Sequence, residues 1–120
     1  MTRLFFAGGF DNNLGYDSVS VKDLAQPSCQ QYPADLPEAS YGAASLKSST
    51  GNPVLCGGQR GVAEADAQPT AECVEYIPEI DAWERRSYSL STEREYCASA
   101  DIGDGRTWIV GGHLEVGAIY

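Results

Sequence analysis

Three Gly-Gly doublets, each at the end of an apolar run, constrain the fold of this chain more than any other feature. They are Gly8-Gly9, Gly57-Gly58 and Gly111-Gly112, and their first glycines are 49 and then 54 residues apart (57 − 8 and 111 − 57). The preceding runs RLFFA, PVLC and RTWIV are rich in β-branched and aromatic residues, which favour strands. A recurrence of about 50 residues is typical of repeat architectures. The sequence therefore predicts several small sheets of one kind.

The unit around the second doublet predicts a sheet of its own. Its expected strands are 40–48, 53–56, 72–77 and 82–90. A long polar loop at 59–70 separates the second strand from the third, and no segment shows sustained helical periodicity. When small antiparallel sheets stand side by side, each covers a face of its neighbour. Closing the row of sheets into a ring leaves only short sheet edges unpaired. The chain is therefore predicted to be all-β.

This unit resembles the kelch repeat of β-propellers, in which an apolar strand ends in Gly-Gly and is followed by a Tyr and, after six further residues, by a Trp. Here Tyr76 and Trp83 follow the second doublet, with 77–82 between them. Many kelch units also start the next blade with an arginine, and Arg94 matches it. The resemblance implies four-stranded antiparallel blades in an incomplete ring, with a partial blade at 1–36, a complete blade at 37–90 and a partial blade at 91–120.

The first unit departs from the kelch pattern. Val21 stands where the Tyr is expected, Cys29 lies near the place of the Trp, and Ala39 replaces the arginine. Because propellers close with about four to eight blades, the remaining blades are expected from a longer chain or from other copies of this one.

Eight residues are expected to be structural. A glycine adopts backbone angles that are closed to residues with a Cβ. Tyr and Trp fill the space between packed sheets and keep a polar atom for a hydrogen bond. The eight residues are Gly8, Gly9, Gly57, Gly58, Gly111, Gly112, Tyr76 and Trp83.

Two of the four cysteines are expected to form a disulfide. Cys56 and Cys73 flank the loop between two neighbouring antiparallel strands, and cross-strand pairs satisfy the geometry of the bond. The alternative is two reduced thiols in a cytosolic protein, so localisation is expected to be extracellular if the pair is oxidised and cytoplasmic otherwise. Cys29 and Cys97 are predicted to stay unpaired. A zinc site is not expected, because the chain has no Cys-x-x-Cys and a single histidine, His113.

Charge argues against two classes of partner. The chain has 8 Lys+Arg and 17 Asp+Glu, a net charge of −9. Nucleic acids and anionic membranes attract clustered cations, and no apolar stretch approaches the roughly 20 residues of a membrane-spanning helix. Neither nucleic acid nor membrane is expected as a partner.

The sequence does not predict an enzyme, a metal or a cofactor. His113 follows a glycine doublet and is predicted to be a loop residue. The resemblance leaves one alternative, a part of a kelch-propeller enzyme acting on carbohydrate, either galactose oxidase-like or sialic-acid-handling, with its catalytic residues outside this chain. The copper site of galactose oxidase is built from two histidines and two tyrosines, and this chain has only one histidine.

A protein-interaction module is the predicted function, because kelch propellers commonly bind proteins through loops at one rim. The corresponding segments are 10–15, 37–39, 59–70 and 91–94, which we call the loop rim. Long loops on a rigid scaffold often carry binding residues, although loop 59–70 could also lack a fixed structure. An unidentified protein or peptide is the expected partner. The candidate contact residues are Asn12, Asn13, Arg60, Glu64, Asp66 and Arg94.

Overall fold

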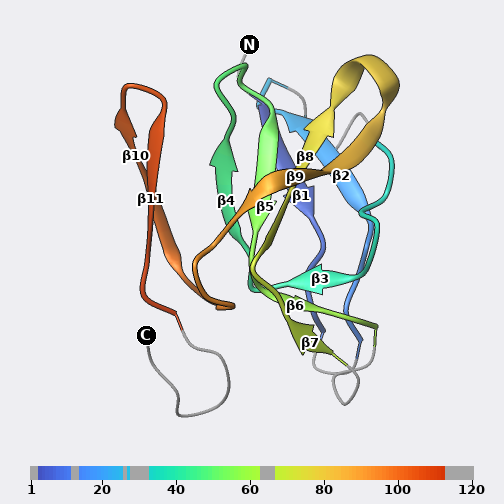
Figure 1. Cartoon of the computed structure of the whole chain (residues 1–120). Coiled ribbons are helices and arrows are strands. Elements are labelled where there is room, and N and C mark those ends of the chain that lie inside the picture. Colours follow the sequence, from blue (N-terminus) through green and yellow to red (C-terminus); the bar gives the residue numbers. More distant parts are fainter. Residues whose placement is uncertain (1–2, 12–13, 26, 28–32, 63–66, 113–120) are drawn as a thin grey trace.

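The computed structural model of the chain describes residues 3–11, 14–25, 27, 33–62 and 67–112, and these residues form an all-β fold (Figure 1). The strands are β1 (Arg3–Ala7), β2 (Val19–Asp23), β3 (Ser40–Tyr41), β4 (Ala44–Lys47), β5 (Pro53–Cys56), β6 (Gln59–Arg60), β7 (Gln68–Pro69), β8 (Glu72–Ile77), β9 (Ala82–Ser89), β10 (Ala98–Gly103) and β11 (Arg106–Val110). A 3₁₀ helix, Pro78–Ile80, joins β8 to β9. Within the described part of the chain, no helix has the length and apolar character needed to cross a membrane.

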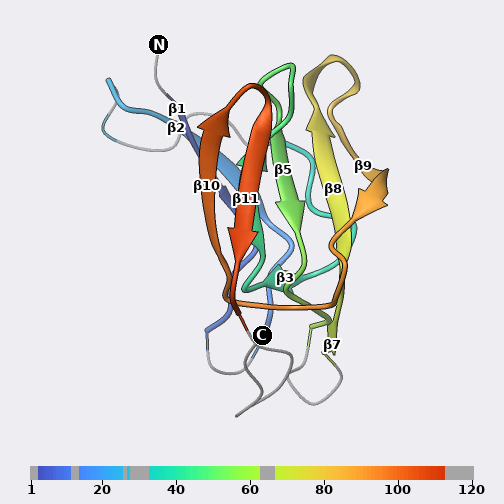
Figure 2. The ribbon, with the colours of Figure 1, turned by 60° about the vertical axis from the view of Figure 1, so that its left-hand side comes forward.

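The strands form several antiparallel sheets that stand next to one another. The central sheet has four strands in the order β4-β5-β8-β9, and it lies between two two-stranded sheets, β1-β2 and β10-β11. A three-stranded sheet of short strands, β3-β6-β7, lies across one end of the molecule (Figure 1). Figure 2 shows the β10-β11 hairpin standing beside the central sheet.

The central sheet follows the strands predicted from the sequence. Successive side chains of a strand point to opposite faces, and Val54, Cys56 and Cys73 on one face form the buried core cluster. Ile109 of β11 packs against this core cluster. On the other face, the ring of Phe5 from β1 lies 5.7 Å from the ring of Tyr76. Both faces of the central sheet are therefore covered by neighbouring sheets.

The predicted disulfide is present. The pairing of β5 with β8 places Cys56 directly opposite Cys73. Their Cα atoms are 4.1 Å apart and their sulfur atoms 2.02 Å apart, and the bond closes a sequence separation of 17 residues. Cys97 is a free, half-buried thiol, and Cys29 lies outside the described residues.

The glycine doublets mark the junctions between sheets. β1, β5 and β11 belong to three different sheets, and each ends at the residue before a doublet. All six glycines have positive φ angles. The N–H of Gly9 donates to the carbonyl oxygen of Ser40 (2.8 Å), and the N–H of Gly58 donates to that of Arg94 (2.7 Å). The second glycine of a doublet thus holds the segment that enters the next sheet.

The segments that follow these two hydrogen bonds are equivalent to each other, so that residues 40–47 correspond to residues 94–101. Gly42 has a φ angle of 70° and Tyr96, in the same place, has a φ angle of 54°. The positive φ of Gly42 divides the predicted strand 40–48 into β3 and β4. A positive φ angle favours glycine, but a single such residue leaves no periodic signal in the sequence.

Two further predicted segments differ from the structure. Loop 59–70 begins with β6 and contains β7, which pair with each other, and β6 also pairs with β3. These strands are two residues long, too short for an alternating pattern to reveal them. Between the predicted strands 72–77 and 82–90, the chain forms the 3₁₀ helix Pro78–Ile80, and the C-cap residue of this helix, Asp81, has a φ angle of 48°.

Candidate functional site

The described parts of the rim segments 10–15, 37–39 and 59–70 lie together at one end of the molecule and are joined by backbone hydrogen bonds. The N–H of Gly15 donates to the carbonyl oxygen of Val62 (2.6 Å), which joins the first rim segment to the third. The N–H of Gly61 donates to the carbonyl oxygen of Ala39 (3.0 Å), which joins the third to the second. Backbone hydrogen bonds of this kind satisfy polar groups in loops and restrict their motion. The described parts of these rim segments therefore form one connected surface.

An aromatic stack, which the sequence did not predict, supports this surface. The rings of Phe10 and Tyr41 are 4.7 Å apart with an interplanar angle of 24°. Phe10 follows the first doublet and forms an isolated bridge with Gly15, while Tyr41 belongs to β3. The one available sequence signal was the position of both residues beside glycines at sheet junctions.

Arg60 is engaged within the protein. Its Nη1 lies 2.7 Å from Oε2 of Glu72, and its side chain is only 11% exposed. Arg85 shares the same carboxylate at 3.2 Å. A partner can reach the Arg60 guanidinium only by sharing or breaking this ion pair.

Arg94 also contacts the protein rather than projecting into solvent. Its Nη1 donates to the carbonyl oxygen of Gly111 (3.3 Å), which links the start of the third unit to its doublet. Its Nε is buried and has no hydrogen-bond partner among the described residues. Burial raises the pKa of the neighbouring Cys97 thiol, and the charge of Arg94 opposes this rise. Arg94 therefore lies between packed segments, at the inner side of the rim.

The other predicted contact residues lie outside the described part of the chain. These are Asn12, Asn13, Glu64 and Asp66, together with the lone histidine, His113. The structure therefore brings Arg60 and Arg94 to the rim end, and the remaining candidates stay predictions.

Apolar side chains are exposed in the rim, at Leu14 and Val62, and directly beside it, at Tyr16. Leu14 is 45% exposed, Tyr16 42% and Val62 59%. The hydroxyl group of Tyr16 donates to the carboxylate of Asp11, and the N–H of Leu14 donates to the same carboxylate (2.9 Å). We call Leu14, Tyr16 and Val62 the rim apolar patch. Exposed apolar side chains held on a rigid backbone suit protein recognition.

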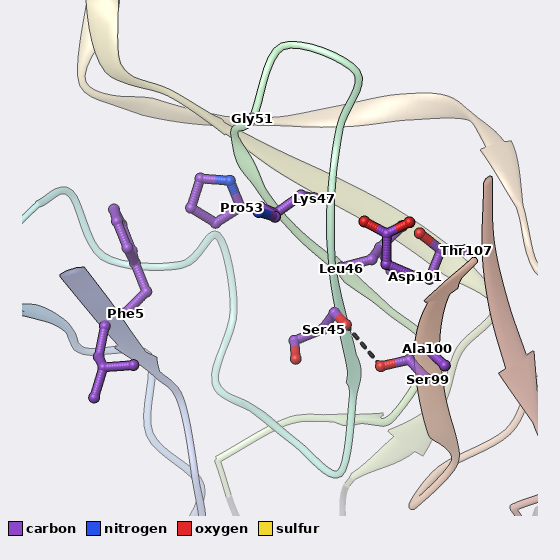
Figure 3. Close-up of a pocket in the computed structure, with 11 residues that line it drawn as sticks. Phe5, Ser45, Leu46, Lys47, Gly51, Pro53, Ser99, Ala100, Asp101 and Thr107 are labelled. Carbon is purple, nitrogen blue, oxygen red and sulfur yellow. Dashed lines mark hydrogen bonds between the residues drawn. The ribbon is translucent and has the colours of Figure 1, made fainter. Parts of the chain in front are cut away.

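A groove of about 630 Å³ opens away from the rim, between β1, the β4–β5 hairpin and the β10–β11 hairpin. Figure 3 shows Phe5 on one side of it, Ser45 and Leu46 in the middle and Asp101 on the other side. The hydroxyl group of Ser99 donates to the carbonyl oxygen of Ser45 (2.8 Å) and so ties β10 to β4. The lining residues are Leu4, Phe5, Ser45, Leu46, Lys47, Gly51, Pro53, Ser99, Ala100, Asp101 and Thr107.

The chemistry of the groove is that of a binding surface. Its charged groups are one cation, Lys47, and one anion, Asp101, and its other polar side chains are hydroxyl groups. Within the described ranges, no cluster of three or more His, Cys, Asp or Glu side chains is placed to hold a metal ion. The groove offers an apolar wall, Leu4 and Phe5, opposite hydroxyl groups and backbone.

At the end of the central sheet that lies away from the loop rim, a hydrogen-bond network holds Tyr76 and Trp83, the two aromatic residues of the repeat. The hydroxyl group of Tyr76 donates to Asp81 (2.6 Å), and the N–H of Ala34 donates to the same carboxylate oxygen (2.9 Å). The Nε1 of Trp83 donates to the carbonyl oxygen of Ala34 (3.0 Å). The hydrogen bond from Tyr76, and then that from Ala34, lower the pKa of Asp81. Burial, and then the bond to Asp81, raise the pKa of Tyr76 to about 12.

Comparisons with known proteins bear on the fold alone. No protein-family model and no curated protein matches the chain. Among solved structures, the chain is similar to the structure of YjhT, with a TM-score of 0.67 and 18% sequence identity. The match covers 91% of this chain and 33% of that chain. The chain therefore spans about a third of the length of that protein and shares its fold over most of its own length.

Proposed function

We propose that this chain is part of a kelch-type β-propeller and that it acts as a protein-interaction module through its loop rim. In this proposal the sheets β1-β2, β4-β5-β8-β9 and β10-β11 are successive blades, of which the central one is complete. The partner is a protein or peptide, and the chain is a binding module rather than an enzyme.

The propeller assignment is supported by equivalent contacts at two junctions. The second glycine of each doublet donates its N–H to the segment entering the next sheet, at Ser40 and at Arg94. Sheets that repeat side by side and bury each other's faces are the building plan of propellers and solenoids. The similarity in fold to a third of the YjhT chain is consistent with this chain being one part of a larger fold. For this protein, the remaining blades come from a longer chain or from other copies.

The binding assignment is supported by the connected backbone of the rim. Three segments that are distant in sequence are joined by hydrogen bonds at Gly15 and Gly61, and they present the rim apolar patch to solvent. A preorganised surface binds with a smaller loss of conformational entropy than a flexible loop. This connection is the observation that carries the proposal. Arg60 and Arg94 contribute by holding the rim in place, through Glu72 and Gly111.

The rim is tested with substitutions of the three patch side chains alone, because exchanging the whole loop 59–70 would also remove Arg60 and the strands β6 and β7. The test variant carries Leu14→Ser, Tyr16→Ser and Val62→Ser. The matched control carries Ile80→Ser, because Ile80 is 61% exposed and lies on the helix that joins β8 to β9, at the other end of the central sheet. Both proteins are used as immobilised baits, and bound proteins are quantified by mass spectrometry.

The proposal predicts that partners recovered by the parent protein and by the Ile80→Ser control are lost from the triple variant, roughly tenfold or more. A loss of this size equals about 1.4 kcal/mol, within the range for removing several interface side chains. Unchanged melting temperatures show that the rim backbone is intact. Equal recovery by the triple variant and the control contradicts binding through the rim.

A further inference from the structure

Acidic side chains surround the rim apolar patch. Asp11, Asp17 and Glu38 are all exposed. The carboxylate of Asp11 accepts hydrogen bonds from Leu14 and Tyr16, which both belong to the patch. Asp17 directly follows Tyr16 in the chain. We call Asp11, Asp17 and Glu38 the acidic border, because they place negative charge next to the apolar surface.

Backbone hydrogen bonds bring Glu38 to this surface from a different segment of the chain. The N–H of Leu36 donates to the carbonyl oxygen of Asp17 (2.8 Å). The N–H of Gly61 donates to the carbonyl oxygen of Ala39, the residue after Glu38 (3.0 Å). Gly61 in turn directly precedes the third residue of the patch. The acidic border is therefore held on the same connected backbone as the patch.

The positive charges of the rim do not balance this border. By sequence, the four rim segments carry two cations, Arg60 and Arg94. Arg60 is paired with Glu72 and is only 11% exposed, and Arg94 lies between packed segments and donates to a backbone carbonyl group. Within the described residues, neither Asp17 nor Glu38 forms an ion pair. The exposed charge next to the patch is therefore negative.

We propose that the partner of the rim is a basic segment, which places an apolar side chain on the patch and lysine or arginine side chains on the acidic border. This inference rests on the proposed function and names the chemistry of its partner. Complementary charge around an apolar contact speeds association and disfavours partners of the wrong sign. The long stems of lysine and arginine also cover apolar surface while their charged groups reach carboxylates. Such side chains suit a carboxylate border that directly adjoins an apolar patch.

An acidic partner is the alternative that the structure favours less. Arg85 is 65% exposed and would be the cation that attracts it. This guanidinium already lies 3.2 Å from the carboxylate of Glu72, and it belongs to β9 rather than to a rim segment. It offers one shared charge, whereas the border offers three carboxylates beside the patch.

The test selects binding peptides without assuming their sequence. Random peptides of roughly 12 residues, long enough to cross the rim, are displayed on phage and selected against the whole chain. The recovered peptides are synthesised, and their affinities are measured for the parent and for the variant with Leu14→Ser, Tyr16→Ser and Val62→Ser. A peptide counts as rim-dependent when the triple variant binds it roughly tenfold or more weakly.

Two further variants each remove two exposed carboxylates. The border variant carries Asp17→Asn and Glu38→Gln. The matched control carries Glu79→Gln and Asp104→Asn, on the helix that joins β8 to β9 and in the β10–β11 turn, at the end of the molecule away from the rim (Figure 1). Both variants change the net charge equally, so a difference between them reports the position of the charge. Asp11 is left intact because its hydrogen bonds hold the patch.

The proposal predicts that the rim-dependent peptides carry a net positive charge. They should bind the border variant roughly three- to tenfold more weakly than the parent and bind the matched control as well as the parent. Added salt should weaken binding to the parent more than binding to the border variant. Exchanging the lysines and arginines of the peptides for glutamine should give a similar loss, and this measurement does not depend on the folding of any variant.

The outcomes separate this inference from the proposed function on which it rests. Rim-dependent peptides that are neutral or acidic overturn the basic partner and leave binding through the rim standing. Equal affinities of the border variant and the matched control, at equal melting temperatures, also overturn it, because the border then has no local effect. A selection that yields no rim-dependent peptide overturns the proposed function and this inference with it.

Discussion

The same repeat position is occupied by three side chains with very different burial. Val54 in the central sheet is 0% exposed, whereas its equivalents Phe5 in β1 and Trp108 in β11 are 37% and 60% exposed. Both exposed side chains are larger than valine. Trp108 lies on the face of β11 opposite Ile109, which packs on the core cluster, and no sheet of the described residues covers that face. Phe5 faces the central sheet, with its ring 5.7 Å from that of Tyr76, but among the described residues its strand β1 is paired on one side alone, by β2. In this fold, burial of a repeat residue is decided by its neighbouring strands and sheets rather than by residue type.

The central and outer sheets also differ in the interactions that stabilise them. The central sheet has the core cluster, the Cys56–Cys73 disulfide and the network around Tyr76. The two outer sheets have long apolar side chains, but few of these are buried. We therefore expect substitutions in the central sheet to cost much more than matched substitutions in the outer sheets.

The two tryptophans should give the largest contrast. Trp83 packs on Tyr76 with ring centroids 5.4 Å apart and donates a hydrogen bond to Ala34. Removing such a side chain, Trp83→Ala, should lower the free energy of unfolding by about 3–5 kcal/mol. Trp108→Ala removes an equally large but exposed ring and should change it by less than about 1 kcal/mol. Urea unfolding of both variants measures the difference, and equal losses would mean that Trp83 is not an anchor.

Reduction of the disulfide should have the next largest effect. A bond that closes a loop of this length stabilises a protein by about 3 kcal/mol, so Cys56→Ala with Cys73→Ala should lose roughly that amount. Cys97→Ser changes a free, half-buried thiol and serves as the control, with a change of less than about 1 kcal/mol. Thiol counting under denaturing conditions checks the bond itself. Two additional reactive thiols in the untreated protein would contradict it.

Alanine substitutions at the second glycines of two doublets should differ by about 2 kcal/mol in their effect on the free energy of unfolding. Gly9 and Gly58 both have positive φ, at 120° and 84°, which an alanine adopts at a cost of about 1 kcal/mol or more. A Cβ on Gly58 would also lie 2.6 Å from the backbone oxygen of Tyr41, whereas a Cβ on Gly9 meets nothing within 4 Å. Gly58→Ala should therefore cost about 3 kcal/mol and Gly9→Ala about 1 kcal/mol. Similar thermal shifts for the two variants would remove the distinction between the junctions.

The smallest effect concerns pH. The pKa of Asp81 is lowered in the folded protein by the bond from Tyr76, so its contribution to stability is present above the unfolded pKa and is lost as pH falls through the folded pKa. The pKa of Tyr76 is raised to about 12, so its contribution is complete below about pH 10 and is lost as pH rises toward 12. Tyr76→Phe should flatten both limbs of a plot of melting temperature against pH.

Tyr16→Phe is the matched control for this pH experiment. Tyr16 also donates to an aspartate, Asp11, but both side chains are exposed at the rim. The hydrogen bond to Asp11 raises the pKa of Tyr16, but solvent screens this exposed pair, so Tyr16→Phe should flatten the alkaline limb much less than Tyr76→Phe does. A change as large as that of Tyr76→Phe would show that the exposed pair matters equally.

The difference between predictable and unpredictable features has a physical basis in this chain. Two features could be predicted from the sequence: that each glycine doublet follows the end of a strand, and that Cys56 lies opposite Cys73. The first depends on local backbone freedom and the second on the order of the strands. The break at Gly42, the short strands β6 and β7 and the stack of Phe10 on Tyr41 depend on contacts between segments far apart in sequence. The ion pair of Arg60 with Glu72 could not be predicted for the same reason, because it forms only when the loop folds back onto β8.

Native-state hydrogen exchange tests most directly the claim that the central sheet is the most stable unit and that the two outer sheets are less stable. We predict that the ladder amides of β5 exchange only through global unfolding, and that those of β1 and β11 exchange through local opening at rates roughly tenfold or more higher. The same measurement with urea should show that opening of the outer sheets exposes little surface and opening of the central sheet exposes much. Equal protection and equal urea dependence of β1, β5 and β11 would contradict the account.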